Sequence, residues 1–365
     1  MTTRDPNLTI ENLGTVLVTG GSGFVGKNFV QTLLDKGLKV KSFDLVPSDL
    51  EHENLSIIEG NICDSDAVAN AVKGVDTVFH TAAIIELKGG KNVTKEYRDR
   101  SYMINVEGTK GLLKALQKAG GKRFIYTASN SVIIGGEPLE NACEETPYTK
   151  RFNDLYTETK VVAEKWVLEQ SGQNGVLTCA IRPSGIWGPG DQTVFRIFFE
   201  QVINGVPMTR VGNGKALLDN TYVHNLIHGQ ILAAEHLIEG GTAPAQAYFI
   251  NDGEPINMFD FAEPIIEACG SKIHNFSVPY WLVHGFMTIW QELHFKFGLP
   301  EPILPPLAIE RIGVNNYFSI EKARKDLGYE PLYTTAQGIE ESKPFYKAMF
   351  NKMAEAAGKH KFVKA

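Results

Sequence analysis

Short apolar runs alternate with amphipathic segments through the first half of the chain. The runs are rich in β-branched and aromatic residues, which is typical of buried strands. Between several of them, apolar residues recur at positions i, i+3 and i+4, which indicates helices. The predicted strands cover residues 15–19, 39–44, 55–59, 76–80, 123–127, 176–181 and 248–250. This alternation predicts an α/β fold in which a parallel sheet is covered by helices on both faces.

The pattern changes after about residue 182. Strands become sparse there, and helical segments and Pro-containing loops predominate. We therefore expect a first domain of residues 1–182 and a smaller, mostly helical C-terminal lobe of residues 183–365. Because residues 248–250 still have the composition of a buried strand, we expect part of this lobe to return to the sheet.

The segment 281–297 carries an apolar stripe at helical spacing, formed by Leu282, Phe286, Ile289, Trp290, Leu293 and Phe297. Such a stripe most often packs on the protein core. Its aromatic content also suits a lid over a flat apolar ligand, or a helix that rests on a membrane. The basic end of the chain, with Lys359, His360, Lys361 and Lys364, would add attraction to an anionic surface, although a solvated tail is the simpler explanation.

The composition restricts the partners and the location of the protein. Its 365 residues include 36 Lys+Arg and 42 Asp+Glu, which gives a net charge of -6. Nucleic-acid binding depends on clustered basic side chains, and the sequence has no such cluster, so we expect no nucleic-acid partner. We find no secretory leader and no apolar run of about 20 residues, and we therefore expect a cytoplasmic protein.

The four cysteines, Cys63, Cys143, Cys179 and Cys269, are widely separated, and the sequence has no Cys-x-x-Cys pair. This spacing favours neither a disulfide framework nor a zinc site, so no metal centre is expected. We expect four buried free thiols, as in a reducing cytosol.

A glycine-rich turn, Gly20-Gly21-Ser22-Gly23-Phe24-Val25-Gly26, follows the first predicted strand and leads into an amphipathic helix. Such glycines allow a tight turn and close approach of the backbone to a pyrophosphate, and the helix N-terminus supplies N–H donors. Asp44 ends the second strand, where a carboxylate can bind the adenosine ribose hydroxyls and repel a 2′-phosphate. The pattern predicts a Rossmann-type, doubly wound domain that binds NAD through Gly20, Gly23, Phe24, Val25, Gly26 and Asp44.

The glycine spacing resembles that of the extended short-chain dehydrogenases/reductases, and other stretches are similar to that family as well. Gly60-Asn61-Ile62 follows the third strand, with Asn61 in place of the usual Asp, and His80-Thr81-Ala82-Ala83 follows the fourth. The stretch from Arg182 to Asp191 resembles the family segment that closes over the nicotinamide. The resemblance implies further cofactor contacts by Asn61, Ile62, Thr81, Ala82, Ala83 and Pro183.

Tyr156 and Lys160 are four residues apart in a segment of helical periodicity, so both side chains lie on one face. An unperturbed Tyr has a pKa of about 10, but a cation within about 4 to 6 Å favours the phenolate by roughly one to three units. Tuned in this way, Tyr156 can accept a hydroxyl proton while a hydride leaves the substrate for NAD. Both residues are also expected to contact the cofactor.

The family resemblance implies a third catalytic group, a hydroxyl after the strand 123–127. Ser129 matches this position and Ser131 is the alternative, although either serine could simply cap a turn. Ser131, Ser184, Gly185 and Trp290 are expected to line the substrate.

Four stretches make the resemblance more specific: residues 126–132 and 151–160, Tyr222-Val223-His224-Asn225-Leu226, and Ile250-Asn251-Asp252-Gly253-Glu254-Pro255. They are similar to the 3β-hydroxysteroid dehydrogenase/Δ5-Δ4 isomerase family, and within it to actinobacterial cholesterol dehydrogenases. The resemblance implies a steroid substrate: NAD-dependent oxidation of the 3β-hydroxyl of a Δ5 sterol to the 3-ketone, followed by isomerisation to the 3-oxo-Δ4 steroid.

The isomerisation needs a group that moves a proton. Asp252 matches the first of two adjacent carboxylates in vertebrate relatives, and Gly253 replaces the second. Asp252 could equally be a turn residue, in which case Tyr156 or another carboxylate would carry the proton.

Alternative functions remain open from the sequence alone. An extended reductase or a nucleotide-sugar epimerase or dehydratase, acting on a non-steroid hydroxyl, shares the sheet and the Tyr-Lys pair, but a nucleotide-sugar enzyme should have a polar and basic second lobe. A non-catalytic NAD-binding regulator would lack the Tyr or the Lys. Extended members often dimerise through helices corresponding to residues 105–119 and 155–169, so a homodimer is a further expectation.

Overall fold

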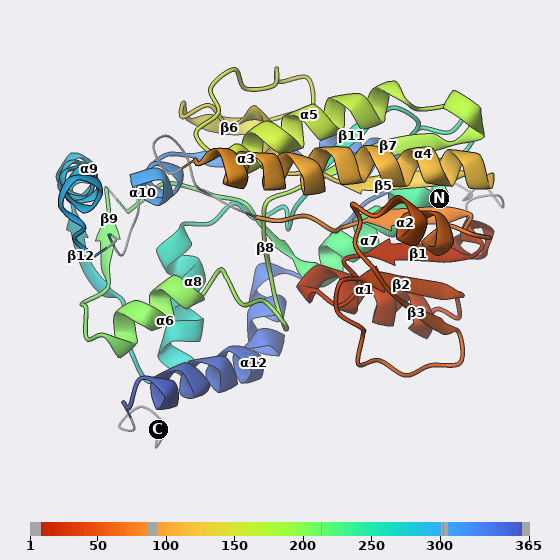
Figure 1. Ribbon diagram of the computed structural model, residues 1–365. Helices are drawn as coiled ribbons and strands as arrows, with labels where there is room; N and C mark the ends of the chain where they lie inside the picture. The colour runs from red at the N-terminus through yellow and green to blue at the C-terminus, as the bar shows by residue number, and fades with distance from the viewer. Residues whose placement is uncertain (1–8, 86–92, 213, 301, 303–305, 360–365) are drawn as a thin grey trace.

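A seven-stranded, fully parallel sheet forms the centre of the molecule (Figure 1). The computed structural model describes residues 9–85, 93–212, 214–300, 302 and 306–359. The strand order across the sheet is β11-β7-β5-β4-β1-β2-β3. These strands are β1 (Val16–Thr19), β2 (Val40–Asp44), β3 (Leu55–Glu59), β4 (Thr77–His80), β5 (Arg123–Thr127), β7 (Leu177–Pro183) and β11 (Ala247–Ile250). The strand order reverses between β1 and β4, which is the crevice where doubly wound sheets bind their ligands.

Helices connect the strands and build the second lobe. The α-helices are α1 (Phe24–Asp35), α2 (Ser65–Ala71), α3 (Lys95–Tyr102), α4 (Thr109–Ala119), α5 (Leu155–Glu169), α6 (Arg196–Ile203), α7 (Val223–Glu235), α8 (Met258–Ala268), α9 (Tyr280–Phe297), α10 (Pro306–Gly313), α11 (Glu321–Leu327) and α12 (Thr335–Ala356). The described residues also contain the short helical turns η1 (Ile10–Leu13), η3 (Met103–Gly108), η4 (Asn130–Ile133) and η5 (Gln173–Gly175).

Alternating side chains of each strand enter two different cores. Val16 and Val18 of β1 pack with apolar residues of α1, α7 and α11, whereas Leu17 packs with those of α2, α4 and α5. This arrangement follows from the two-residue period of a strand and explains why the central strands are apolar throughout. The predicted fold class is confirmed, and each predicted strand is present to within two residues at its ends.

The later part of the chain forms a mostly helical lobe around a separate core that includes Trp187, Phe195, Phe199, Phe261 and Tyr346. Short parallel strand pairs lie outside the main sheet: β8 (Gly185–Trp187) with β10 (Asn220–Tyr222), β9 (Thr209–Val211) with β12 (His274–Val278), and β6 (Leu139–Ala142) with β13 (Asn316–Phe318). The pair of β6 and β13 connects the first half of the chain to its later part. Strand β11 returns to the main sheet and pairs with β7. The division of the chain at residues 182 and 183 stays a prediction.

Two expectations from the sequence are wrong in part. Leu282, Phe286, Ile289 and Phe297 of α9 are exposed, which shows that most of the apolar stripe does not pack on the core. The four cysteines are free, but Cys63 is exposed and Cys143 is only half-buried, so buried thiols are limited to Cys179 and Cys269. Within the described residues, no helix has the length and apolarity needed to cross a membrane.

Candidate active site

One large cavity begins at the glycine turn after β1 and extends into the helical lobe. Its volume is about 1120 Å³, which exceeds the roughly 300 to 1,000 Å³ of a typical single-ligand pocket. The predicted cofactor residues all line it: Gly20, Gly23, Phe24, Val25, Gly26, Asp44, Asn61, Ile62, Thr81, Ala82, Ala83, Tyr156, Lys160 and Pro183. Ser129, Ser131, Ser184 and Gly185 line it as well. The structure therefore brings together residues from six different strand ends and loops.

The glycine turn is closed tightly on itself. Gly20 has a φ of +69°, and a Cβ added at Gly26 would lie 2.0 Å from the Gly20 carbonyl oxygen. Only glycine fits at residue 26, because a side chain there would displace the backbone of the turn. The turn leads directly into α1, whose N-terminal residues face the cavity and can offer N–H groups to a phosphate.

Asp44 stands beside this turn at the end of β2. Its carboxylate accepts hydrogen bonds from the backbone N–H groups of Ser22 (3.1 Å) and Val46 (3.3 Å). Asn61, after β3, accepts from the Cys63 N–H at 2.9 Å and so fixes its loop. A carboxylate held at this place can accept hydrogen bonds from vicinal hydroxyls such as those of a ribose.

The backbone after β4 approaches the glycine turn closely. A Cβ at Gly20 would lie 3.0 Å from the Ala82 Cα, and the Thr81 hydroxyl donates to the Thr19 carbonyl at 2.6 Å. These small residues leave room for a ligand between β1 and β4. The narrow glycine cradle, the helix N-terminus and Asp44 together fit the pyrophosphate and ribose of a dinucleotide.

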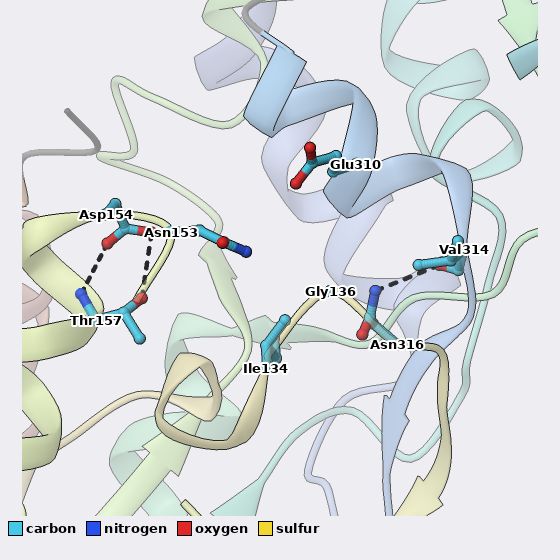
Figure 2. Close-up of a pocket in the computed structure, with 8 residues that line it drawn as sticks. All are labelled: Ile134, Gly136, Asn153, Asp154, Thr157, Glu310, Val314 and Asn316. Atoms are coloured by element: carbon cyan, nitrogen blue, oxygen red, sulfur yellow. Dashed lines mark hydrogen bonds between the residues drawn. The ribbon is translucent and has the colours of Figure 1, made fainter. Parts of the chain in front are cut away.

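Helix α5 presents Tyr156 and Lys160 to the cavity. Asp154 caps the helix by accepting from the Thr157 N–H at 2.7 Å, as Figure 2 shows. Lys160 is buried, donates to the Thr127 carbonyl at 2.7 Å, and lies 5.6 Å from the centroid of the Tyr156 ring. Burial lowers the pKa of Lys160 to about 7, and the charge of Glu164 opposes this shift.

Buried polar contacts hold α5 in place. Arg182 at the end of β7 forms an ion pair of 2.6 Å with Glu164 of α5, and both side chains are buried. On the other side, the Asn105 amide donates to the Thr159 hydroxyl at 3.1 Å and exchanges hydrogen bonds with the backbone of Ile84. Asn105 therefore has a structural role, and no pattern in the sequence pointed to Glu164 as an anchor of α5.

The end of β5 supplies two serines to the cavity wall. The Ser129 hydroxyl accepts from the Ser131 N–H at 3.2 Å, so it also caps the turn η4. Among the described residues, the buried Ser131 hydroxyl has no hydrogen-bond partner. The neighbouring Asn130 amide donates to the Ser184 hydroxyl at 3.2 Å, which connects this turn to the segment after β7.

Beyond these polar residues the cavity becomes apolar. Its wall is formed there by Val194, Ile197, Phe198, Met208, Val211, Leu218, Met258, Phe259 and Ile312, which come from α6, α8, α10 and the strand segments between them. In the described part of the lining, the basic side chains are Lys27 and Lys160. This end of the cavity therefore suits an apolar ligand with few polar groups.

Two predicted site residues do not line the cavity. Trp290 lies on α9 and donates its indole N–H to the Pro300 carbonyl at 2.9 Å. Asp252 is buried, and both of its carboxylate oxygens accept hydrogen bonds, from the Tyr222 N–H and Asn225 amide and from the Trp187 indole. Another carboxylate, that of Asp219, does line the cavity. Asp219 was not predicted as a site residue from the sequence, although it lies only three residues before the stretch 222–226 that carries the family resemblance.

The sequence matches the family model of the 3-beta hydroxysteroid dehydrogenase/isomerase family over residues 17–280. It is 61% identical to a 3-beta-hydroxysteroid dehydrogenase of Mycolicibacterium neoaurum, over 96% of this chain and 95% of that protein. It is 60% identical to a 3 beta-hydroxysteroid dehydrogenase/Delta 5-->4-isomerase of Mycobacterium tuberculosis, over 97% of this chain and 95% of that protein.

Solved structures resemble this chain in fold. An epimerase from Methanothermobacter thermautotrophicus superposes with a TM-score of 0.74 at 22% identity, covering 95% of this chain and 96% of that one. A UDP-glucuronic acid 4-epimerase from Bacillus cereus, in complex with NAD, superposes with a TM-score of 0.71 at 19% identity, covering 92% and 99%. At these identities the likeness establishes the Rossmann-type fold and no more.

Proposed function

This chain belongs to the 3-beta hydroxysteroid dehydrogenase/isomerase family, and from that membership we propose that it oxidises the 3β-hydroxyl of a Δ5 sterol with NAD and then converts the product to the 3-oxo-Δ4 steroid. The observation that carries this proposal is the single cavity, which joins a dinucleotide cradle to an apolar region with Tyr156, Lys160 and Ser129 between them. A sterol offers one hydroxyl on an apolar ring system, and this arrangement matches both parts.

NAD is the cofactor, and it supplies the hydride acceptor when bound. The glycine turn and the N-terminus of α1 bind its pyrophosphate, and Asp44 binds the adenosine ribose and disfavours a 2′-phosphate. Asn61 and Ile62 would hold the adenine, and Thr81, Ala82, Ala83 and Pro183, which line the same cavity, would contact the remaining part of the cofactor.

Tyr156 acts as the general base of the oxidation, and its phenolate takes the proton of the 3β-hydroxyl. The ammonium group of Lys160, held by the Thr127 carbonyl, favours the phenolate electrostatically. Ser129 donates a hydrogen bond to the same substrate oxygen and orients it. Such acid-base catalysis contributes typically 10²- to 10⁴-fold to a rate.

The apolar end of the cavity binds the ring system of the sterol. A nucleotide-sugar substrate would require cationic or polar partners for its diphosphate, because phosphates are bound by charge-assisted hydrogen bonds. Most side chains here are instead apolar, such as Met208, Val211 and Phe259, and in the described lining of the whole cavity the basic side chains are Lys27 and Lys160. Ser131, Ser184 and Gly185 form the polar boundary at which the reacting end of the sterol lies.

We further propose that α9 contacts a membrane surface. Its exposed apolar side chains include Trp281, Phe286, Ile289 and Phe297, each more than half exposed. Figure 1 shows α9 beside α10 at the end of the molecule remote from β3, and Ile312 of α10 lines the cavity. Sterols reside in membranes, so this position brings the lipid surface near the apolar end of the site. His360, Lys361 and Lys364, the other basis for this expectation, lie outside the described residues.

The membrane proposal is tested by sedimentation with phosphatidylcholine vesicles. Wild-type protein should pellet with the vesicles, and the double variant Phe286→Glu, Ile289→Glu should remain in the supernatant because exposed apolar area drives interfacial binding. Glu292→Gln, on the same helix, is the matched control. Equal recovery of wild type and double variant in the supernatant contradicts the proposal.

A homodimer is proposed through α4 and α5, which lie side by side over one face of the sheet (Figure 1). Ala115 of α4 and Trp166 of α5 are only partly buried in the single chain, and a second copy would cover them. Light scattering during size-exclusion chromatography gives the mass directly. A mass of one chain at micromolar concentration contradicts this arrangement.

The proposed activity is tested by following two products separately. Purified protein with NAD and a 3β-hydroxy-Δ5 steroid should produce NADH and, after it, the conjugated enone. NADH without enone would remove the isomerase half of the proposal. If neither NADH nor enone forms although titration shows that NAD binds, the substrate is another alcohol.

A further inference from the structure

The isomerisation requires a proton carrier that is distinct from Tyr156. Once the 3β-hydroxyl is oxidised, Tyr156 holds the proton it accepted and donates a hydrogen bond to the new ketone. Migration of the double bond then requires removal of a proton from C4 and addition of a proton at C6. A carboxylate can perform both transfers if it faces the substrate and is buried enough to accept a proton. The inference below rests on the proposed function and identifies the residue for its second step.

Three carboxylates line the cavity in the part of the chain that the structure describes: Asp44, Asp191 and Asp219. Asp44 is beside the glycine turn, at the end of the cavity assigned to the adenosine. Asp191 is saturated, because its oxygens accept hydrogen bonds from Thr193, from Val194 and from the Tyr346 hydroxyl. Asp219 is the remaining candidate.

Asp219 is buried but incompletely bonded. Its Oδ2 accepts hydrogen bonds from the Asn251 amide (3.0 Å) and from the backbone N–H of Phe318. Its Oδ1 has no hydrogen-bond partner among the described residues. The carboxylate is therefore held at one oxygen while the other is free to exchange a proton. Asp252, in contrast, is outside the cavity lining and has both oxygens occupied.

The wall of the cavity is continuous from Ser129 to Asp219. Asn130, next to Ser129, donates to Ser184, and the following residue, Gly185, pairs with Asn220 in the two-stranded ladder of β8 and β10. The Asn220 amide nitrogen is buried and lacks a partner within the described residues. Asp219 donates its backbone N–H to the Asn316 carbonyl at 3.2 Å, and Asn316 also borders the small hollow beside α10 that Figure 2 shows.

The electrostatics of this position suit a group that both accepts and returns a proton. Burial, and then the nearby charge of Asp252, raise the pKa of Asp219 to about 7, while the Phe318 N–H opposes the shift. A carboxyl group with a pKa near neutrality has a substantial basic fraction and also forms a competent acid.

We propose that Asp219 is the acid-base residue of the Δ5-Δ4 isomerisation. Its Oδ1 removes a proton from C4 of the 3-oxo-Δ5 steroid, and the C4–H electron pair enters the conjugated dienolate. The Tyr156 phenol stabilises the dienolate oxygen by a hydrogen bond. The protonated Asp219 then delivers the same proton to C6, the C4–C5 double bond forms and the C5–C6 double bond is lost. The step is redox-neutral and requires no further reactant.

The test supplies the 3-oxo-Δ5 steroid directly and follows enone formation. Asp219→Asn keeps the shape of the side chain but removes the base, so isomerase turnover should fall at least about 100-fold. Turnover of NADH formation from the 3β-hydroxy steroid is measured in the same preparation, and the isomerase loss should far exceed the dehydrogenase loss. Asp252→Asn is the matched control, measured well above pH 7, where Asp219 is ionised with or without the charge of Asp252. There it should lower both turnovers by similar factors, because it removes buried hydrogen bonds and not the proton carrier.

Three further measurements keep the proposal testable if Asp219→Asn folds poorly. The isomerase turnover of the wild type should rise with pH and reach half its maximum near 7, because only ionised Asp219 can accept the C4 proton. Asp219→Glu should restore part of the turnover and keep a similar pH dependence. Substrate labelled with deuterium at C4 should transfer part of the label to C6.

Several results would overturn the assignment. If Asp219→Asn isomerises the steroid as fast as the wild type, Asp219 is not the acid-base residue. The same holds if the isomerase turnover of the wild type does not change with pH near 7. Neither result affects the proposed function. A wild type that forms NADH but does not isomerise the added 3-oxo-Δ5 steroid removes both Asp219 and the isomerase half of the function. A selective isomerase loss in Asp252→Asn would transfer the role to Asp252.

Discussion

The two ends of the cavity are built in different ways. The dinucleotide end consists of backbone and short side chains at the ends of β1, β2, β3 and β4, close together in sequence. The sterol end consists of apolar side chains from α6, α8, α10 and the segments between them, drawn from residues about 194 to 312. Phosphates and ribose require groups at fixed places and angles, whereas an apolar ring system requires mainly volume and the absence of water.

This difference predicts unequal tolerance to mutation. A carbon atom added to a glycine of the turn would contact backbone atoms, which cannot move away. A change of similar size at the sterol end meets other side chains, which can adopt new rotamers. The residues proposed as catalytic lie between the two ends and combine both requirements.

The largest effect is expected for Tyr156→Phe. Removal of the phenolic oxygen eliminates the general base, and the dehydrogenase kcat should fall about 10²- to 10⁴-fold with little change in thermal stability. Steady-state NADH formation measures this loss. Tyr148→Phe is the control, because the Tyr148 hydroxyl is bound to Glu164 at 2.8 Å and is absent from the cavity lining. A Tyr156→Phe enzyme with most of its turnover would exclude the assigned base.

The next largest effect is expected for Gly26→Ala. The added Cβ would lie 2.0 Å from the Gly20 carbonyl oxygen, so the turn must open and the dissociation constant for NADH should rise on the order of 100-fold. Fluorescence titration measures this constant. Gly111→Ala is the matched control on α4, where a Cβ meets nothing within 4 Å, and it should leave NADH affinity unchanged while adding about 0.5 to 1 kcal/mol of stability. Equal affinities in the two variants would contradict this account of the turn.

Lys160→Met should lower the dehydrogenase activity and raise the stability of the folded protein. Burial in the folded state lowers the pKa of Lys160 from 10.5 to about 7. Below pH 7 the amine is therefore charged in both states, and burying this charge lowers the free energy of unfolding. The variant should be more stable than the wild type by about 1 to 3 kcal/mol at pH 6, since each pKa unit corresponds to about 1.4 kcal/mol and the lost Thr127 contact offsets part.

The stability difference between wild type and Lys160→Met should shrink as the pH rises from 7 towards 10.5, where the wild-type amine becomes neutral in both states. Urea unfolding at several pH values measures it. A wild type that is the more stable protein at pH 6 would show that the ammonium is better solvated than its burial implies.

The smallest effect is expected for Met208→Leu at the sterol end. Met208 is buried and lines the cavity, but the replacement conserves volume and polarity and should cost less than about 1.5 kcal/mol of stability. The value of kcat/KM for the sterol should change less than about threefold. A loss as large as that of Gly26→Ala would mean that the sterol end is as rigid as the dinucleotide end.

The sequence sufficed to predict the sheet and the residues that gather around the glycine turn. Each strand is a contiguous run, and Gly26, Asp44 and Tyr156 are recognised from spacing within one strand-turn-helix or one helix. Local periodicity and turn chemistry therefore determine these parts, and tertiary contacts only bring them together.

The remaining parts depend on contacts between distant residues. Asp219 acquires its environment from Asn251 and Phe318, which lie 32 and 99 positions away, and no spacing rule connects them. Glu164 becomes an anchor only because Arg182 reaches it across the end of the sheet. For α9, the apolar stripe was recognised, but periodicity alone could not show that this face is exposed rather than buried.

We propose that one cavity holds NAD and a steroid at once, with Tyr156 between them. A crystal structure determined with NADH and a 3-oxo-Δ4 steroid tests it most directly. We expect the steroid rings to lie among Ile197, Met208 and Phe259, and the 3-oxo oxygen to lie within about 2.6 to 3.2 Å of the Tyr156 hydroxyl. A steroid bound elsewhere, or one that displaces the dinucleotide from the glycine turn, would contradict it.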